Sequence, residues 1–426
     1  MDSKKIAVIG GGPKAAALAA KVYCLREVYG VPLELVIFEP VSIGAAWSGA
    51  CGYTDGKQRI CTPPEKDVGF PYSVDAFGQP INEIMYRDFS WPMYLLKNQK
   101  YAEWVDRGRQ RPRHSEFSNY LKHCIDKSDA FVYQARVTHL VPNGRKSNLR
   151  WSIKAVQTQT SSDEFEVGEF DGVVVTGPGP VASKFAKVSD PRVLDGVNFW
   201  SQLSAVEGII RDSDEPIIIL GSGGTAAAIA GWMAAKEMDN EILIMGTQSS
   251  LFARIENSFE NSAFTDQKQW TALSVDERKK FTERLTRGAV WSTVINILSD
   301  ARNVSYISGR ATKVSLVDPE NVASDLLVRF TTSAGESYSK PACLVIDSTG
   351  FDAMWFASLL PHRWKKFLRD NSQDMQDGML PSLELPIGAL PRLHAPMLSH
   401  VVSPAFTSLM SLGGMSDAIL RRYIEL

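Results

Sequence analysis

Two glycine-rich turns are the residues of this sequence best suited to chemistry. Both read G-x-G-x-x-A, one at 10–15 and one at 221–226. In this pattern the glycines permit a tight turn and a close approach of the backbone to a pyrophosphate, which lies on the N-terminus of the following helix. Two such turns predict two bound dinucleotides, a flavin and a nicotinamide. The predicted cofactor-binding residues of the turns are Gly10, Gly12, Lys14 and Ala15 in the first and Gly221, Gly223, Thr225 and Ala226 in the second.

The elements that must position these turns are readable from the apolar pattern. An apolar strand precedes each turn, at 6–9 and at 217–220, and an Ala-rich helix follows it. The first helix is expected near 13–29 and leads to a second strand at 33–38. The fold class is therefore predicted as α/β, with two Rossmann-like dinucleotide-binding domains.

The residues after the second strand of each unit indicate which dinucleotide binds where. Glu39 ends the first of these strands, where a carboxylate accepts hydrogen bonds from ribose hydroxyls. The corresponding strand at 241–245 ends in Gly246-Thr247-Gln248-Ser249-Ser250, without a carboxylate to repel a 2′-phosphate. Gln248 and Arg254, the nearest cation, are the predicted contacts. We therefore expect FAD on the first unit and NADPH on the second.

The chain order predicts that the second unit is inserted into the first. We expect an FAD-binding domain at 1–200 and 341–426, and an NADPH-binding domain at 201–340. The strand at 344–347 is expected to bring the chain back to the first domain. A long stretch at 44–112, rich in glycine, proline and aromatic residues, is expected to be irregular and to line the flavin and substrate sites.

Composition excludes several other classes of function. A net charge of −2 gives no argument for binding nucleic acid or an anionic membrane surface. No apolar run approaches the roughly 20 residues of a membrane span, and the apolar N-terminus, broken by glycines, is expected to be a strand and not a signal peptide. The dispersed cysteines and histidines predict a cytoplasmic protein without disulfides or metal. The cysteines are Cys24, Cys51, Cys61, Cys124 and Cys343.

Several strings, in their order along the chain, carry a family resemblance. They are Gly11–Ala17, Gly44–Trp47, Pro64–Tyr72, Phe259–Asn261 and Asp347–Gly350. Together they resemble the flavin-dependent N-hydroxylating monooxygenases of siderophore biosynthesis, and most closely the mycobactin-type L-lysine N6-hydroxylases. The Pro64–Tyr72 string is the most specific of them.

The resemblance implies roles for individual residues and a reaction. It implies that Trp47 belongs to the FAD site with the first turn and Glu39, that Lys66 and Asn261 bind the amino-acid substrate, and that Asp347 and Gly350 lie near the flavin. The implied reaction consumes NADPH and O₂, forms a C4a-hydroperoxyflavin and hydroxylates the terminal amine of L-lysine. No side chain is expected to act as a catalytic acid or base, because the flavin carries the chemistry.

Two departures and several alternatives accompany this interpretation. Cys61 replaces a glutamine of the ornithine enzymes, which disfavours ornithine, and Ser403–Phe406 replaces a G-P-G-F turn. A disulfide reductase is disfavoured by the lack of a redox cysteine pair, and a Baeyer–Villiger oxygenase by the lack of histidine at 181–199. Another amine substrate (ornithine, a cadaverine-like diamine or an acylated lysine), a non-catalytic flavin-binding member of the family and a homo-oligomeric state all stay open.

Overall fold

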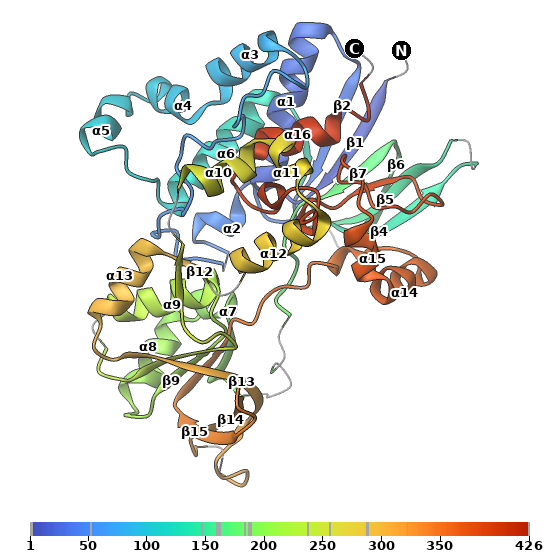
Figure 1. The fold of residues 1–426 in the computed structure, drawn as a ribbon. Coiled ribbons are helices and arrows are strands. Elements are labelled where there is room, and N and C mark those ends of the chain that lie inside the picture. The colour runs from blue at the N-terminus through green and yellow to red at the C-terminus, as the bar shows by residue number, and fades with distance from the viewer. Residues whose placement is uncertain are drawn as a thin grey trace.

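The computed structural model describes residues 3–424 apart from 52, 146–147, 159–162, 183–184, 186–189, 237, 255–256, 287–288 and 322. Two α/β units are visible in Figure 1, and both chain termini lie at the same end of the first. No helix among the described residues is long and apolar enough to cross a membrane.

A five-stranded parallel sheet forms the centre of the first unit. Its order is β17-β7-β1-β2-β3, so β1 lies in the middle. The strands are β1 (Lys4–Ile9), β2 (Leu33–Phe38), β3 (Phe131–Tyr133), β7 (Gly172–Val175) and β17 (Arg392–His394). Helix α1 (Pro13–Tyr29) connects β1 to β2, which confirms the predicted strand–turn–helix–strand unit. Helices α6 (His114–Ser128) and α16 (Leu412–Leu420) pack against α1.

A second, antiparallel sheet belongs to the same unit. It contains β4 (Ala135–Asn143), β5 (Arg150–Gln157) and β6 (Glu164–Phe170).

The stretch at 44–112 is more regular than its composition predicts. It contains α2 (Ala45–Ser48), α3 (Gln79–Phe89), α4 (Trp91–Lys97) and α5 (Tyr101–Asp106). The expectation of an irregular stretch is thus wrong for its second half. Ile81, Met85 and Phe89 are all buried and are spaced by four residues, which is the pattern of a helix with one apolar face.

The second unit is built on a seven-stranded sheet with the order β15-β14-β13-β10-β9-β16-β8. Its strands are β8 (Val193–Asp195), β9 (Ile217–Leu220), β10 (Ile242–Gly246), β13 (Val304–Leu316), β14 (Leu326–Thr332), β15 (Ser337–Ala342) and β16 (Leu344–Asp347). Strand β16 pairs in parallel with β9 and β8, so the expected return of this strand to the first unit is wrong. The sheet spans 193–347, beyond the expected limits of 201 and 340, and the chain rejoins the first sheet only at β17.

A helical arm leaves the second unit and packs on the first. It consists of α10 (Ser258–Thr265), α11 (Gln267–Ala272) and α12 (Val275–Thr286) and lies between β11 (Phe252–Arg254) and β12 (Ala289–Trp291), which pair with each other. Phe264 of the arm belongs to the core of the first unit, and Trp270 Nε1 donates to Val401 O at 3.2 Å. The expected assignment of the whole range 201–340 to the second domain is wrong for this arm, which Figure 1 shows in yellow beside α16.

The other helices complete the two units. They are α7 (Asn198–Ser201), α8 (Leu203–Arg211), α9 (Gly224–Ala234) and α13 (Ser292–Asp300) in the second, and α14 (His362–Asp370), α15 (Ser372–Asp377), η1 (Trp355–Leu359), η2 (Pro396–Leu398) and η3 (Pro404–Thr407) in the segment that returns to the first.

Candidate active site

The two glycine turns have the same backbone construction. The N–H of Gly10 donates to Phe38 O at 2.9 Å, and the N–H of Gly221 donates to Met245 O at 2.7 Å. Their φ angles are +103° and +111°, in the region that favours glycine. Each turn is therefore fixed to the end of the second strand of its own unit.

Open space lies in front of both helices. A Cβ atom added to Gly12, Gly223 or Gly224 would meet no atom within 4 Å. Neither α1 nor α9 has a side-chain hydrogen bond at its N-cap. The N-terminal N–H groups of both helices can thus be reached by a phosphate, and both turns fit a dinucleotide pyrophosphate.

Glu39 and Trp47 lie close to the first turn. The Glu39 carboxylate accepts from the N–H of Gly11 at 2.8 Å and from that of Val41 at 2.9 Å, which fixes it at the end of β2. Gly44, at the start of α2, donates its N–H to Gly11 O at 2.9 Å, so α2 is held against the turn. Trp47 of α2 is half-buried. Both residues stay predicted FAD contacts.

Lys14, a predicted residue of the first turn, is its one charged member. It is buried, and its Nζ lies 3.4 Å from Ser408 O. Burial lowers the pKa of the Lys14 ammonium to about 8. Ala15, the last residue of the turn, is fully buried in the core.

The predicted NADPH-binding residues around the second turn are not all brought together in one place. Gln248 is half-buried, and its carbonyl accepts from the hydroxyl of Tyr306 at 2.9 Å. The Arg254 guanidinium lies 5.1 Å from the ring centre of Phe264 and 5.2 Å from that of Trp291. Thr225, in the part of the turn that begins α9, is half-buried. Contact of these residues with the nicotinamide cofactor stays a prediction.

The two predicted substrate residues meet, although 195 positions separate them. Lys66 Nζ lies 3.3 Å from Asn261 Oδ1, and both side chains are half-buried. The same ammonium lies 3.6 Å from Met410 Sδ and 5.8 Å from the ring centre of Phe70. Asn261 reaches Lys66 because the helical arm packs on the first unit. The result is a cation and an amide beside apolar surface, which suits an amino-acid carboxylate and a carbon chain.

Asp67 fixes the backbone that carries Lys66. Its carboxylate accepts from the N–H of Gly69 at 3.0 Å, the hydroxyl of Tyr72 at 2.8 Å and the N–H of Trp91 at 2.9 Å. Burial nevertheless raises the pKa of this carboxyl to about 6, because the three donors only partly offset the loss of water.

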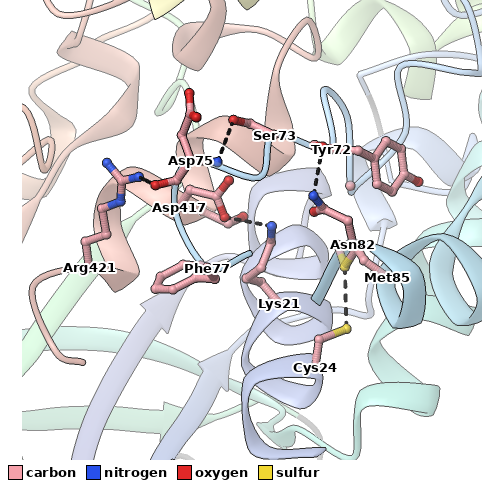
Figure 2. Close-up of polar contacts among 12 residues, drawn as sticks. Lys21, Cys24, Tyr72, Ser73, Asp75, Phe77, Asn82, Met85, Asp417 and Arg421 are labelled. Atoms are coloured by element: carbon pink, nitrogen blue, oxygen red, sulfur yellow. Dashed lines mark hydrogen bonds and ion pairs between the residues drawn. The ribbon is translucent and has the colours of Figure 1, made fainter. Parts of the chain in front are cut away.

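Helix α16 holds the other side of the same loop. The N–H of Gly413 donates to Phe70 O at 2.8 Å. Lys21 of α1 and Asp417 of α16 form a buried ion pair at 2.6 Å. Figure 2 shows this pair together with the contact between Arg421 and the Asp75 carbonyl, which joins the end of α16 to the loop. In Figure 2 the Asn82 amide also points to the Tyr72 carbonyl, at 2.8 Å.

Asp347 and Gly350 lie where the chain leaves the second unit. Asp347 is buried, and its Oδ1 accepts from the Thr349 hydroxyl at 2.6 Å. Gly350 has a φ of +124°, and its carbonyl accepts from the N–H of Ala182 at 2.9 Å. This hydrogen bond joins the two chain segments that connect the units, one at Ala182 and the other at Gly350. Proximity of these residues to the flavin stays a prediction.

Three residues beside the site were not predicted from the sequence. Thr176 donates its hydroxyl to Ile9 O at 2.9 Å, and a Cβ atom on Gly10 would lie 2.6 Å from that hydroxyl. Tyr306 fixes the Gln248 carbonyl, and Met410 contacts Lys66. Thr176 follows an apolar strand, which is a usable signal, whereas nothing in the sequence marks Tyr306 or Met410.

Two dinucleotide folds in one chain, with an ammonium and an amide placed together beside the first, define a flavin- and NADPH-dependent oxidoreductase. A family model described as L-lysine 6-monooxygenase/L-ornithine 5-monooxygenase matches residues 86–324. The chain is 33% identical over 433 residues to the L-lysine N6-monooxygenase MbtG of Mycobacterium tuberculosis, covering 97% of this chain and 94% of that protein. It is 32% identical to MbtG of Mycolicibacterium paratuberculosis, with the same coverage. The chain belongs to the L-lysine 6-monooxygenase/L-ornithine 5-monooxygenase family.

Solved structures agree with this assignment. The lysine monooxygenase NbtG of Nocardia farcinica, described as having an unprecedented NADPH domain conformation, matches with a TM-score of 0.80 and 29% identity over 98% of this chain and 99% of that one. The ornithine hydroxylase PvdA of Pseudomonas aeruginosa, at 14% identity and a TM-score of 0.71 over 98% of both chains, shares the fold. The predicted fold class, family, enzyme class and cofactors FAD and NADPH are confirmed.

Proposed function

We propose that this chain hydroxylates the terminal nitrogen of L-lysine, using FAD, NADPH and O₂, for the biosynthesis of a siderophore or a related metabolite. The observation that carries the proposal is the contact between Lys66 Nζ and Asn261 Oδ1 at 3.3 Å. It gathers a cation and an amide from distant parts of the chain at one place. The relatives named as lysine N6-monooxygenases support lysine as the amine.

The residues present would hold both cofactors by their pyrophosphates. Gly10–Ala15 and α1 would bind FAD, and Gly221–Ala226 and α9 would bind NADPH. Bound FAD, reduced by NADPH, supplies the activation of O₂ and the transfer of one oxygen atom to nitrogen. The polypeptide binds the cofactors and the substrate, orients them, and excludes water from the site.

Lys66 and Asn261 grip the amino-acid end of the substrate in this proposal. Lys66 pairs with the α-carboxylate, and Asn261 donates its amide hydrogens to the same group. The terminal amine must be neutral to attack oxygen, although the pKa of a free lysine amine is ~10.4. Removal of water from around the amine, at the other end of the substrate from Lys66, lowers the pKa of that amine.

The test is a measurement of hydroxylamine formed per NADPH oxidised, with L-lysine, L-ornithine and cadaverine compared under air. We expect tight coupling with lysine, because a carboxylate at Lys66 and a chain of four methylenes are both required. One methylene is worth about 1–3 kcal/mol, so ornithine should react ~10- to 200-fold less efficiently. Coupled product with cadaverine equal to that with lysine would refute the carboxylate grip. Hydrogen peroxide alone with all three amines would refute the reaction for these substrates.

Two further proposals concern the cellular location and the oligomeric state of the enzyme. Its five cysteines are all free, which supports a cytoplasmic location. Fluorescence microscopy of a tagged chain in its host tests that location. We also propose self-association, and the 86% exposed Phe259 on the helical arm is the residue chosen to probe it. Sedimentation of the wild type and of Phe259→Ser tests this point.

A further inference from the structure

Lys14 is a buried cation that has no ion-pair partner among the described residues. The residue occupies the first turn of α1 and is only 6% exposed. Its hydrogen bond to Ser408 O is long, at 3.4 Å, and among the described residues no carboxylate forms an ion pair with it. Lys21, seven residues later on the same helix, is also buried but is paired with Asp417 at 2.6 Å.

The position of Lys14 makes an unpaired ammonium costly. The N-terminus of a helix is positive, so a cation in its first turn is repelled and not stabilised. A buried charge without a counter-charge also loses its hydration. The lowered pKa of Lys14, about 8, expresses this cost. A protonated Lys14 therefore calls for an anion that the described polypeptide does not supply.

The contacts of Lys14 point from the glycine turn toward the substrate residues. Its partner Ser408 lies two positions before Met410, and the Ser408 hydroxyl accepts from the N–H of Met410 at 3.2 Å. Met410 in turn touches Lys66 at 3.6 Å. The Lys14 side chain thus joins the dinucleotide turn to the segment that lines the amino-acid grip.

We propose that the Lys14 ammonium is the charge partner of the reduced isoalloxazine ring of FAD, and that it favours the reduced cofactor. NADPH gives up a hydride, one proton with two electrons, and leaves as NADP⁺, so the neutral oxidised ring gains one negative charge. The pyrophosphate is charged in both redox states and would not distinguish them. The ring must lie next to the substrate amine, within the length of one lysine side chain from the carboxylate at Lys66, and Lys14 extends to the segment that contacts Lys66. This inference rests on the proposed function for the location of the ring.

The test compares Lys14→Met and Lys14→Gln with the wild type. The dissociation constant of oxidised FAD and the midpoint potential of the bound flavin are measured under anaerobic conditions, without lysine and without NADPH. We expect the ratio of reduced to oxidised FAD affinity to fall about 10- to 100-fold, which lowers the two-electron midpoint potential by about 30–60 mV. The affinity for oxidised FAD should change by less than about threefold.

A matched control removes the other buried lysine of α1 together with its partner. The double variant Lys21→Met, Asp417→Leu should keep the wild-type midpoint potential, whatever its stability. A lower affinity for oxidised FAD with an unchanged potential would assign Lys14 to the pyrophosphate and overturn the proposal, as would no change in either quantity. If Lys14→Met does not fold, Lys14→Gln decides by the same criteria. Because no amine is present in the assay, a wrong substrate assignment would leave this result unaffected.

Discussion

The contact of α16 with the Lys66 loop allows a quantitative prediction for Gly413→Ala. A Cβ atom at position 413 would lie 2.1 Å from Gly69 O and 2.8 Å from Phe70 O. Ordinary contact begins at 3.4 Å, so the two backbones must separate by about 1.3 Å. That separation breaks the 2.8 Å hydrogen bond from the N–H of Gly413 to Phe70 O.

The expected cost has two parts. Overpacking costs about 1–3 kcal/mol and the lost hydrogen bond about 1 kcal/mol, so the free energy of unfolding should fall by about 2–4 kcal/mol. Lys66 lies three residues before Gly69 on the displaced loop. A shift of about 1 Å in a positioning group costs up to ~100-fold, so kcat/KM for L-lysine should fall about 10- to 100-fold.

The assay pairs urea unfolding with coupled turnover. Gly413→Ala should oxidise NADPH and form peroxide in place of hydroxylamine, because both glycine turns are untouched. Gly388→Ala is the matched control, since its Cβ atom would meet nothing within 4 Å. Wild-type stability and KM in Gly413→Ala would refute the claim that this close approach positions Lys66.

Three further predictions concern the grip, the second turn and pH. Lys66→Ala should raise the KM for L-lysine about 10- to 100-fold through loss of a charge-assisted hydrogen bond, while stopped-flow reduction of FAD by NADPH is retained; loss of that reduction would remove Lys66 from the substrate site. Gly223→Val should keep bound FAD, visible in the flavin spectrum, but abolish its reduction by NADPH, whereas an FAD-free protein would show that the two turns are interchanged. The pKa of Asp67 is raised from 3.8 to about 6 on folding, so its contribution to stability is fully present below about pH 4 and is lost as pH rises through about 6, at most about 3 kcal/mol. Urea unfolding between pH 4 and 7 should show this loss in the wild type but not in Asp67→Asn, and parallel profiles would contradict it.

The local elements of the dinucleotide units could be predicted because they depend on short-range rules. The strand at 33–38 and the helix at 13–29 follow from apolar runs that flank a glycine turn, and the structure has both with these bounds. Helix α3 was missed although Ile81, Met85 and Phe89 carry its period, since the surrounding glycine, proline and aromatic residues favour loops.

The arrangement of distant segments could not be predicted in the same way. An apolar run such as 344–347 identifies a buried strand but not its neighbours, which tertiary pairing selects. The same limit applies to the contact between Lys66 and Asn261, which the family resemblance, and not their spacing, led us to expect. Lys14 was expected only as part of the turn, and the lack of an ion pair to it among the described residues is visible only in three dimensions.

The helical arm has a consequence for protein engineering. Residues 258–286 belong by sequence to the second unit but pack on the first, where Phe264 joins its core and Asn261 completes the grip. A chimera that exchanged the whole of 193–347 between relatives would therefore also exchange half of the grip and part of a foreign core. A cleaner graft would transplant the seven-stranded sheet and its helices but keep the native arm, with the joints at the paired strands β11 and β12. In this enzyme the part that can be exchanged between relatives is therefore not the whole of the continuous segment 193–347.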